Sequence, residues 1–237
     1  MKFCFTVEIA LIKLQINCNS EKIKEVCKDF IVDEPPLFSV FPSESDIREY
    51  FSKGVGSLEY CEMLAVFKRI AETLPLYGAY LLHGAGIKYK ERGIIFLASS
   101  GVGKTTHVNL WKKYLGDEVE IINGDKPFLK EEDGEIFFYD EPWRGKERYG
   151  NRGKAILTDF CIVKRAKQNK ITPLSTREIL EELLNRLYLP SCESSLEKTL
   201  AFLDKLPLYR AYLLECNVDE QAFITAFNAL TGEEYED

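Results

Sequence analysis

The sequence predicts an α/β protein with a mixed β-sheet. Apolar runs typical of buried strands, such as residues 94–98, alternate with segments whose apolar residues recur at three- and four-residue steps. A glycine-rich segment, residues 98–106, joins that run to one of these helices. The turn signal at 90–93 places another strand directly before the run, as in a hairpin. Because a purely parallel sheet joins its strands by helical crossovers, the hairpin indicates that both strand orientations are present.

Length and charge bound the possible functions. The chain has 237 residues, 46% of them hydrophobic and 29% charged, which is typical of a globular protein with a sizeable core. It carries 31 Lys and Arg residues against 38 Asp and Glu residues, a net charge of −7. Because phosphate backbones require a basic surface, this balance argues against nucleic acid as the main partner. We expect a small amino-terminal α+β module over residues 1–56 and a larger domain over 57–237.

The cysteines and the first apolar run indicate the cellular compartment of the protein. The seven cysteines are scattered and include no Cys-x-x-Cys pair, which argues against a disulfide framework or a zinc knuckle and suits a reducing compartment. Residues 3–16 contain Glu8 and Lys13 and lack a cleavage site of small residues, so a strand is favoured over a signal peptide. No run reaches the roughly 18 apolar residues of a membrane span. We therefore expect a cytoplasmic protein that binds no membrane.

Signals along the chain predict its elements in order. In the amino-terminal module a helix over 20–30 follows the first strand, and irregular segments surround Pro35 and Pro42. A helix over 57–74 begins at the N-cap Ser57 and docks the module on the rest. The later elements are strands at 77–90, 94–98, 119–122, 156–164 and 209–216, a hairpin at 128–139 around Asp133-Gly134, a loop at 140–154, and a helix after the glycine-rich segment that ends at Gly116.

Three further helices complete the prediction. Two begin with the capping boxes Ser175-x-x-Glu178 and Ser194-x-x-Glu197, and prolines at 190 and 207 bound them. The last helix covers 219–230.

The glycine-rich segment has the features of a phosphate-binding loop. It follows a buried strand and opens an amphipathic helix, and its glycines let backbone N–H groups converge on an anion at the positive end of that helix. Ala98 stands where the strict pattern has glycine. The alternative is a strand-to-helix turn that binds nothing. The predicted nucleotide-binding residues are Ser99, Ser100, Gly101, Val102, Gly103, Lys104, Thr105 and Thr106.

A phosphate-transferring site also needs an acid. Asp125 follows the strand after the loop helix, where a magnesium ligand or a general base belongs. Its alternative role is that of a turn residue. Asp140 is the rival, but it follows the second arm of a hairpin and is better explained as structural. A GTPase is disfavoured, because no Asp has Gly three residues later and 169–172 lacks the base-reading acid.

Residues 82–164 resemble the catalytic domain of the HPr kinase/phosphorylase family and its HPr-kinase-like relatives, within the phosphoenolpyruvate carboxykinase-like fold. Segment 100–105 is similar to the family's loop, and His83-Gly84 precedes the loop lysine at the family's spacing. Asn123-Gly124-Asp125 stands where the family has an acidic pair. Segment 142–147 looks like the Pro-Trp-x-Gly segment of smaller relatives, including those encoded beside peptide-modification genes.

The resemblance implies a barrel-like mixed sheet and a kinase that uses ATP and Mg²⁺ to phosphorylate a Ser or Thr of a small protein or peptide. It assigns phosphate contacts to Lys104, a metal role to Thr105, a base or metal role to Asp125, and an orienting or phosphate-contacting role to His83. Where the family has two adjacent acids this chain has Gly124 and Asp125. One carboxylate must therefore act alone or Glu147 supplies the second, and phosphorylase activity stays open.

Some residues have two interpretations. Arg144, Lys146, Arg148 and Arg152, with Glu147 among them, are candidates for contact with a phosphate or an acidic substrate, or they form a solvated charged loop. His83 is equally compatible with a core position. His107, in the helix after the loop, is expected to be structural.

Two other functions compete with the kinase. A nucleotide-binding regulatory module without transfer activity fits the single acid. A carboxykinase-type lyase fits the pair Thr105-Thr106 and the fold that the resemblance implies, but such enzymes are about twice this length, and two histidines could hardly supply their metal ligands. Neither the phosphate acceptor nor the oligomeric state follows from the sequence.

Overall fold

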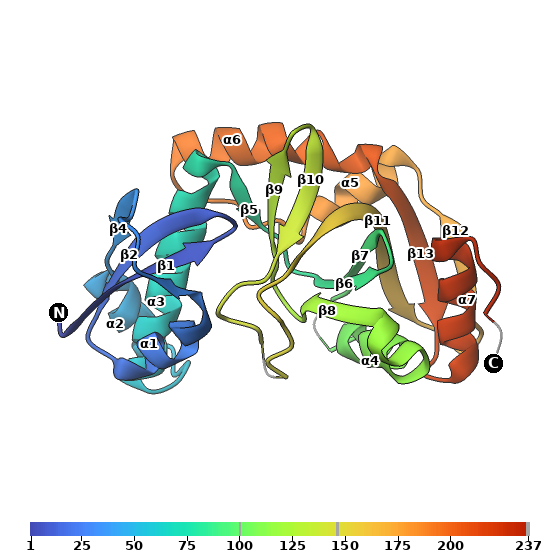
Figure 1. Ribbon diagram of the computed structural model, residues 1–237, viewed down its shortest axis with the longest axis horizontal. Helices are drawn as coiled ribbons and strands as arrows, with labels where there is room; N and C mark the ends of the chain where they lie inside the picture. Colours follow the sequence, from blue (N-terminus) through green and yellow to red (C-terminus); the bar gives the residue numbers. More distant parts are fainter. Residues whose placement is uncertain (100, 146, 236–237) are drawn as a thin grey trace.

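The computed structural model describes residues 1–99, 101–145 and 147–235. Within these ranges the chain forms two sheets: a small one at the amino-terminal end, drawn in blue at the left of Figure 1, and a large one that occupies the rest of the molecule. Ser100 and Lys146, two of the predicted site residues, lie outside the described ranges. No helix in the described part is long and apolar enough to cross a membrane.

The amino-terminal sheet is built on a hairpin. Its strands follow the order β3-β1-β2-β4: β1 (Phe3–Ile9), β2 (Ile12–Cys18), β3 (Ile31–Val32) and β4 (Phe38–Val40). The single strand predicted over 3–16 is therefore wrong. The chain reverses at Ala10 and Leu11, whose φ angles are +48° and +63°. Residues other than glycine seldom adopt this left-handed conformation. Because Ala10 and Leu11 are not residues that usually form such turns, the turn has no recognisable sequence signal.

Helices cover this sheet: α1 (Glu21–Cys27), η1 (Lys28–Phe30), α2 (Glu44–Ser52), α3 (Leu58–Thr73) and η2 (Leu74–Tyr77). Ser57 caps α3 as predicted, accepting a hydrogen bond from the Tyr60 N–H. Helix α2 was not predicted, although Ser43 caps it through the Asp46 N–H. We call β1–β4 with α1–α3 the N-terminal unit. The domain boundary after residue 56 stays a prediction.

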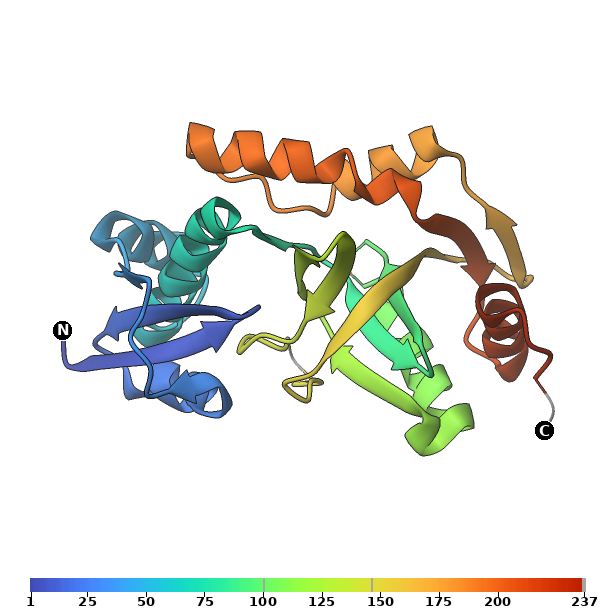
Figure 2. The same ribbon diagram turned by 45° about the horizontal axis from the view of Figure 1, so that its top comes forward.

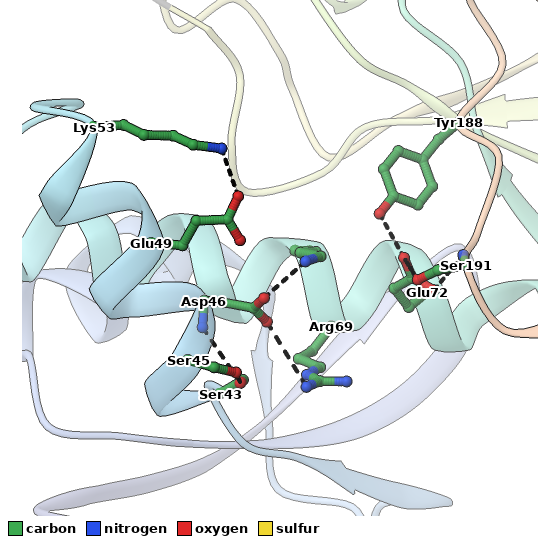
Figure 3. Close-up of polar contacts among 10 residues, drawn as sticks. Ser43, Ser45, Asp46, Glu49, Lys53, Arg69, Glu72, Tyr188 and Ser191 are labelled. Carbon is green, nitrogen blue, oxygen red and sulfur yellow. Dashed lines mark hydrogen bonds and ion pairs between the residues drawn. The ribbon is translucent and has the colours of Figure 1, made fainter.

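Carboxylates on these helices hold neighbouring elements together (Figure 3). Asp46 of α2 accepts a hydrogen bond from Lys68 Nζ of α3 at 2.7 Å. At the end of α3, Glu72 accepts hydrogen bonds from the Tyr188 hydroxyl at 2.8 Å and from the Ser191 N–H and hydroxyl at 2.9 Å each. Glu72 therefore ties the N-terminal unit to a segment more than a hundred residues later in the chain.

The large sheet is mixed, as predicted. Its nine strands are β5 (Ala79–Leu81), β6 (Ala85–Tyr89), β7 (Arg92–Leu97), β8 (Val119–Asn123), β9 (Phe128–Glu132), β10 (Glu135–Tyr139), β11 (Lys154–Arg165), β12 (Lys170–Pro173) and β13 (Arg210–Cys216). The predicted hairpins β6–β7 and β9–β10 are confirmed, whereas β12 was not predicted. The long strand β11 pairs with β10 at its start and with β7 and β13 further along, so the sheet curls into a half-barrel (Figures 1 and 2).

Helices flank this sheet: α4 (Lys104–Leu115), η3 (Gly116–Glu118), α5 (Thr176–Leu184), α6 (Glu193–Leu203), η4 (Leu206–Leu208) and α7 (Glu220–Thr231). The capping box of Ser175 and Glu178 is confirmed. The second one is wrong, because α6 begins two residues earlier, with Cys192 as N-cap and no side-chain cap. Figures 1 and 2 show α6 along the top of the molecule, reaching from the sheet to the N-terminal unit.

One hydrophobic cluster joins the two parts of the chain. It contains Val66, Phe67 and Ile70 of α3 together with the strands of the N-terminal sheet, and also Phe128 and Tyr139 of the large sheet. Burial of these side chains removes apolar surface from water on both sides of α3. The amino-terminal sheet is thus packed firmly beside the edge of the large sheet, and this fixes the surroundings of the candidate site.

Candidate functional site

The glycine-rich loop, His83 and Asp125 lie at one edge of the large sheet. Strands β7, β11 and β13 are parallel, and β8 points the same way because both β7 and β8 pair antiparallel with β6. The ends of these strands therefore lie at a common edge. The glycine-rich loop follows β7, Asp125 follows β8, Arg165 ends β11, and His83 lies just before β6. In open α/β sheets this carboxyl edge is where ligands bind.

The glycine-rich loop leads into α4 through two glycines with positive φ angles. Gly101 and Gly103 have φ angles of +77° and +124°, which side chains rarely tolerate. Helix α4 begins at Lys104 without a side-chain cap, so the N–H groups of its first turn are available to an anion. Arg165 fixes the loop by donating hydrogen bonds to the carbonyl oxygens of Gly101 at 2.6 Å and Val102 at 2.7 Å.

Lys104 is a buried cation next to Asp125. Its side chain is 10% exposed, its Nζ lies 3.7 Å from Asp125 Oδ1, and Nζ makes no hydrogen bond to a described residue. Burial lowers the pKa of Lys104, and the charge of Asp125 acts against this shift. Burial of an ammonium group costs free energy, and at 3.7 Å the Asp125 carboxylate offsets this cost only in part.

Asp125 lies among three basic side chains. His83 Nε2 is 3.5 Å from Oδ1 and Lys126 Nζ is 3.7 Å from Oδ2, in addition to the contact with Lys104. Burial acts to raise the pKa of Asp125, but the hydrogen bond from His83 and the charges of Lys126 and Lys104 outweigh it and hold the pKa below its ordinary value. Asp125 is therefore a carboxylate at neutral pH, able to accept a proton or bind a cation.

The backbone around Asp125 is also fixed. The side-chain oxygen of Asn123, which is fully buried, accepts hydrogen bonds from the N–H groups of Asp125 at 2.9 Å and Lys126 at 2.7 Å. The Gly84 N–H donates to the Asp125 carbonyl at 3.0 Å, which couples Asp125 to the His83-Gly84 turn. Gly145 packs so closely that a Cβ there would lie 2.9 Å from the Cβ of Asp125.

Arg186 is a site residue that sequence reasoning missed. Its carbonyl accepts a hydrogen bond from the His83 N–H at 2.9 Å, and its charge helps to lower the pKa of Lys104. The side chain is 9% exposed, and its Nε has no hydrogen-bond partner among the described residues. Nη1 pairs with Glu182 at 2.5 Å. No local signal marks Arg186, because a bridge between Leu82 and Leu187 brings it into the site.

Asp140 organises the loop that follows β10, in keeping with the structural role expected for it. Its carboxylate accepts hydrogen bonds from Asn123 Nδ2 at 3.0 Å and from the backbone N–H groups of Glu141 and Arg152 at 2.8 Å each. Arg144, a candidate substrate residue, forms an ion pair with the same carboxylate at 2.6 Å and lies 3.6 Å from Asp29. The guanidinium of Arg144 thus bridges this loop and the N-terminal unit.

The remaining predicted residues occupy different environments. Thr105 is half-buried in the first turn of α4, whereas Ser99 and Thr106 are exposed. Glu147, the proposed second acid, is also exposed. Among the residues that the structure describes, no group of three or more His, Cys, Asp or Glu side chains could hold a metal ion. Magnesium commonly binds through one or two protein oxygens plus substrate phosphates, and Thr105 and Asp125 are oxygen donors of that kind.

Another acid whose charge is coupled to Asp125 is Glu141, the residue after Asp140. Glu141 is fully buried, and one carboxyl oxygen accepts a hydrogen bond from the Trp143 N–H at 2.7 Å, whereas the other has no partner among the described residues. Burial, together with the charges of Asp140 and Asp125, raises the pKa of Glu141 to about 8. Glu141 is therefore mainly protonated at neutral pH and is a poor ligand for a cation.

His107 has a partner that the sequence did not reveal. Its Nε2 accepts a hydrogen bond from Trp111 Nε1 at 3.2 Å, one turn later on α4. Burial lowers the pKa of His107 to about 3, so the ring is neutral at physiological pH. The expectation that His107 is structural agrees with this packing.

Comparisons with known proteins add little. No protein-family model matches the chain. No curated protein matches it either. Among solved structures it is similar to the Hpr(Ser) kinase/phosphatase from Coxiella burnetii, with a TM-score of 0.30 and 10% sequence identity over 54% of this chain and 92% of that one. This similarity is weak.

Proposed function

We propose that the chain is an ATP-dependent phosphotransferase that transfers the γ-phosphate to a hydroxyl group. The observation that carries this proposal is the buried Lys104 ammonium, which has no hydrogen bond to a described residue and lies between the amino end of α4 and the Asp125 carboxylate. A cation, a helix amino terminus and a carboxylate are the groups that hold a triphosphate and activate a hydroxyl. Two of these groups sit on a loop whose glycine conformations suit close approach of phosphate.

In the proposed reaction each residue has a defined part. The N–H groups of the loop and Lys104 bind the phosphate oxygens. Asp125 takes the proton of the acceptor hydroxyl as the new O–P bond forms and the bond from the γ-phosphorus to the β–γ bridging oxygen breaks, with ADP leaving. His83 holds Asp125 in place through the contact at 3.5 Å. Magnesium, when bound, would neutralise charge on the phosphates, with Thr105 and Asp125 as its protein ligands.

The acceptor is proposed on the sequence resemblance, as a Ser or Thr hydroxyl of a small protein or peptide. The site itself favours an anionic reaction centre, because Lys104, Lys126 and Arg186 bring positive charge to a single ionised carboxylate.

Transfer of label from γ-labelled ATP to candidate proteins and peptides tests the proposal. Asp125→Asn should lower transfer by about 10²–10⁴-fold, because the general base is lost, while nucleotide binding is retained. Asp117→Asn is the matched control, since Asp117 lies just after α4 and is fully exposed. If no label moves with Mg²⁺ or Mn²⁺ to any acceptor, or if Asp125→Asn transfers as well as the native chain, the kinase proposal fails.

A regulatory nucleotide-binding module is the second candidate. The observation in its favour is that Glu141, a buried acid whose charge is coupled to Asp125, has a pKa raised to about 8 and so does not supply a second negative charge at neutral pH. Slow ATP turnover that Asp125→Asn leaves unchanged, with nucleotide binding intact, would favour this module over the kinase.

A further inference from the structure

A cavity of about 330 Å³ lies beside the glycine-rich loop. One wall comes from the loop and α4, and the opposite wall from the ends of β11 and β13. The residues around it include Val102, Thr106, Leu110, Val163, Arg165 and Val218. The size falls within the range of about 300–1,000 Å³ that is usual for small-molecule sites. The cavity shares the glycine-rich loop with the site around Asp125, but its other wall, at the ends of β11 and β13, has no part in that site.

The cavity and Asp125 lie on opposite sides of the loop. Across the sheet the strands follow the order β13, β11, β7, β6 and β8. The loop continues from β7 in the middle, Asp125 follows β8 on one side, and the cavity lies at the ends of β11 and β13 on the other. A triphosphate bound along the loop with its γ-phosphate near Asp125 would therefore direct its other end toward the cavity.

The walls of the cavity suit a planar aromatic base. Val102, Leu110, Val163 and Val218 present apolar surface. His107 also borders the cavity, and because its pKa is about 3 it adds no charge at neutral pH. Burial of a flat, weakly polar ring between such groups is favourable.

Arg165 adds a planar cation to this site. Its guanidinium is held by hydrogen bonds at 2.6 Å and 2.7 Å to the carbonyl oxygens of Gly101 and Val102. A guanidinium stacks well on aromatic rings, and one that is already held loses little conformational entropy when a ligand binds. Arg165 therefore links the cavity to the loop that would hold the phosphates.

We infer that this cavity binds the base and ribose of the nucleotide whose phosphates lie on the glycine-rich loop. The inference rests on the proposed function for the placement of the phosphates. It adds that the protein selects a nucleoside triphosphate over an inorganic polyphosphate, and that residues at the ends of β11 and β13 make this selection.

Val218→Trp in the full chain tests the inference. Val218 is 68% exposed at the mouth of the cavity, so a larger side chain there can occupy the cavity without disturbing the core. Binding of MgATP and of magnesium tripolyphosphate is measured by isothermal titration calorimetry. The native chain should bind MgATP at least tenfold more tightly than tripolyphosphate. Val218→Trp should weaken MgATP binding about tenfold and leave tripolyphosphate binding within twofold.

Two control variants distinguish failure of the inference from failure of the proposed function. Leu208→Trp places the same side chain at an 82% exposed position on η4 and should bind both probes as the native chain does. Lys104→Met should lose both probes, because it removes the phosphate contact. Equal affinity of the native chain for the two probes, or an unchanged affinity ratio in Val218→Trp, would overturn the inference and leave the phosphate site standing. If Lys104→Met still binds both probes, or if the native chain binds neither, the proposed function is overturned, and the inference with it.

Discussion

Lys104 and Arg186 are two cations with buried nitrogen atoms that have no hydrogen-bond acceptor among the described residues. Each unpaired nitrogen raises the free energy of the folded state, and the charge of Arg186 adds to this by lowering the pKa of Lys104. In the proposed function, a bound phosphate would offset the cost at Lys104. This arrangement resembles other functional sites, where strained or unpaired groups are retained because a ligand completes them.

Replacement of Arg186 tests its part in the site. Arg186→Leu should lower kcat/KM for phosphate transfer by about 10²-fold, because a cation near the transferred phosphoryl group is lost. Arg177→Leu is the control, since Arg177 lies on α5, just before the segment that carries Arg186, is 88% exposed and pairs only with Glu181 among the described residues. Equal kcat/KM in Arg186→Leu and the native chain would show that Arg186 only joins α5 to the sheet.

Glu141 should make stability depend on pH. Its folded-state pKa is about 8, above the ordinary value of 4.5, so the folded chain holds a proton that the unfolded chain releases. The stability that this proton supplies is present below pH 4.5 and is lost as pH rises toward 8. Glu141→Gln does not titrate, and its Tm relative to the native chain should therefore increase between pH 5 and pH 8, by several degrees. Glu147→Gln, at an exposed position of the same loop, should show no such trend.

At the scale of elements, the loop after β10 and the segment after α5 shape the site, and the segment after α5 carries no recognisable motif. The loop is held by Asp140 and packs Gly145 against Asp125. The segment after α5 supplies Arg186 and is anchored to α3 through Tyr188 and Ser191. Elements that are remote in the sequence thus fix the position of the predicted acid.

Substitution of Glu72 tests whether its hydrogen bonds anchor the segment after α5 to α3. Burial acts to raise its pKa, but the hydrogen bonds from Tyr188 and Ser191 outweigh it and lower the pKa below the ordinary value. Glu72→Gln weakens these bonds, and we expect a loss of about 1–3 kcal/mol in the free energy of unfolding, measured by urea denaturation. Glu59→Gln, at an exposed position near the start of α3, should change it by less than about 0.5 kcal/mol. A loss no larger in Glu72→Gln than in Glu59→Gln would contradict the anchoring.

At the scale of the whole molecule, the N-terminal unit and the large sheet share a hydrophobic cluster. The two tryptophans report on different places: Trp111 is fully buried on α4, and Trp143 packs against Phe67 of α3 with ring centroids 4.9 Å apart. Because Phe67 and Trp143 pack on the shared cluster, the two parts should lose structure together.

Unfolding in urea should therefore be a single transition. The fluorescence of Trp143→Phe reports on Trp111, and that of Trp111→Phe reports on Trp143. For each variant we expect the fluorescence midpoint to coincide with the circular dichroism midpoint. Separate midpoints within one variant would show that the N-terminal unit unfolds on its own.

Much of the local structure was predictable, because local chemistry determines it. The glycines of the loop, the Asp133-Gly134 turn, and the caps at Ser57 and Ser175 act over a few residues, and each is found where the sequence predicts it. The turn at Ala10 and Leu11 and the start of α6 at Glu193 were predicted wrongly. At the turn, tertiary packing imposes a backbone conformation that the local residues do not favour.

The sequence by itself determined the mixed α/β class and the loop that opens α4, and it identified Lys104 and Asp125 as candidate site residues. Only the tertiary structure decided that His83 and Arg186 lie beside these two residues, that Asp140 and Arg144 pair with each other, and that a cavity opens at the ends of β11 and β13. The physical reason is that motifs act through the backbone of neighbouring residues, whereas pairing across the sheet and packing between distant segments depend on how the whole chain is folded.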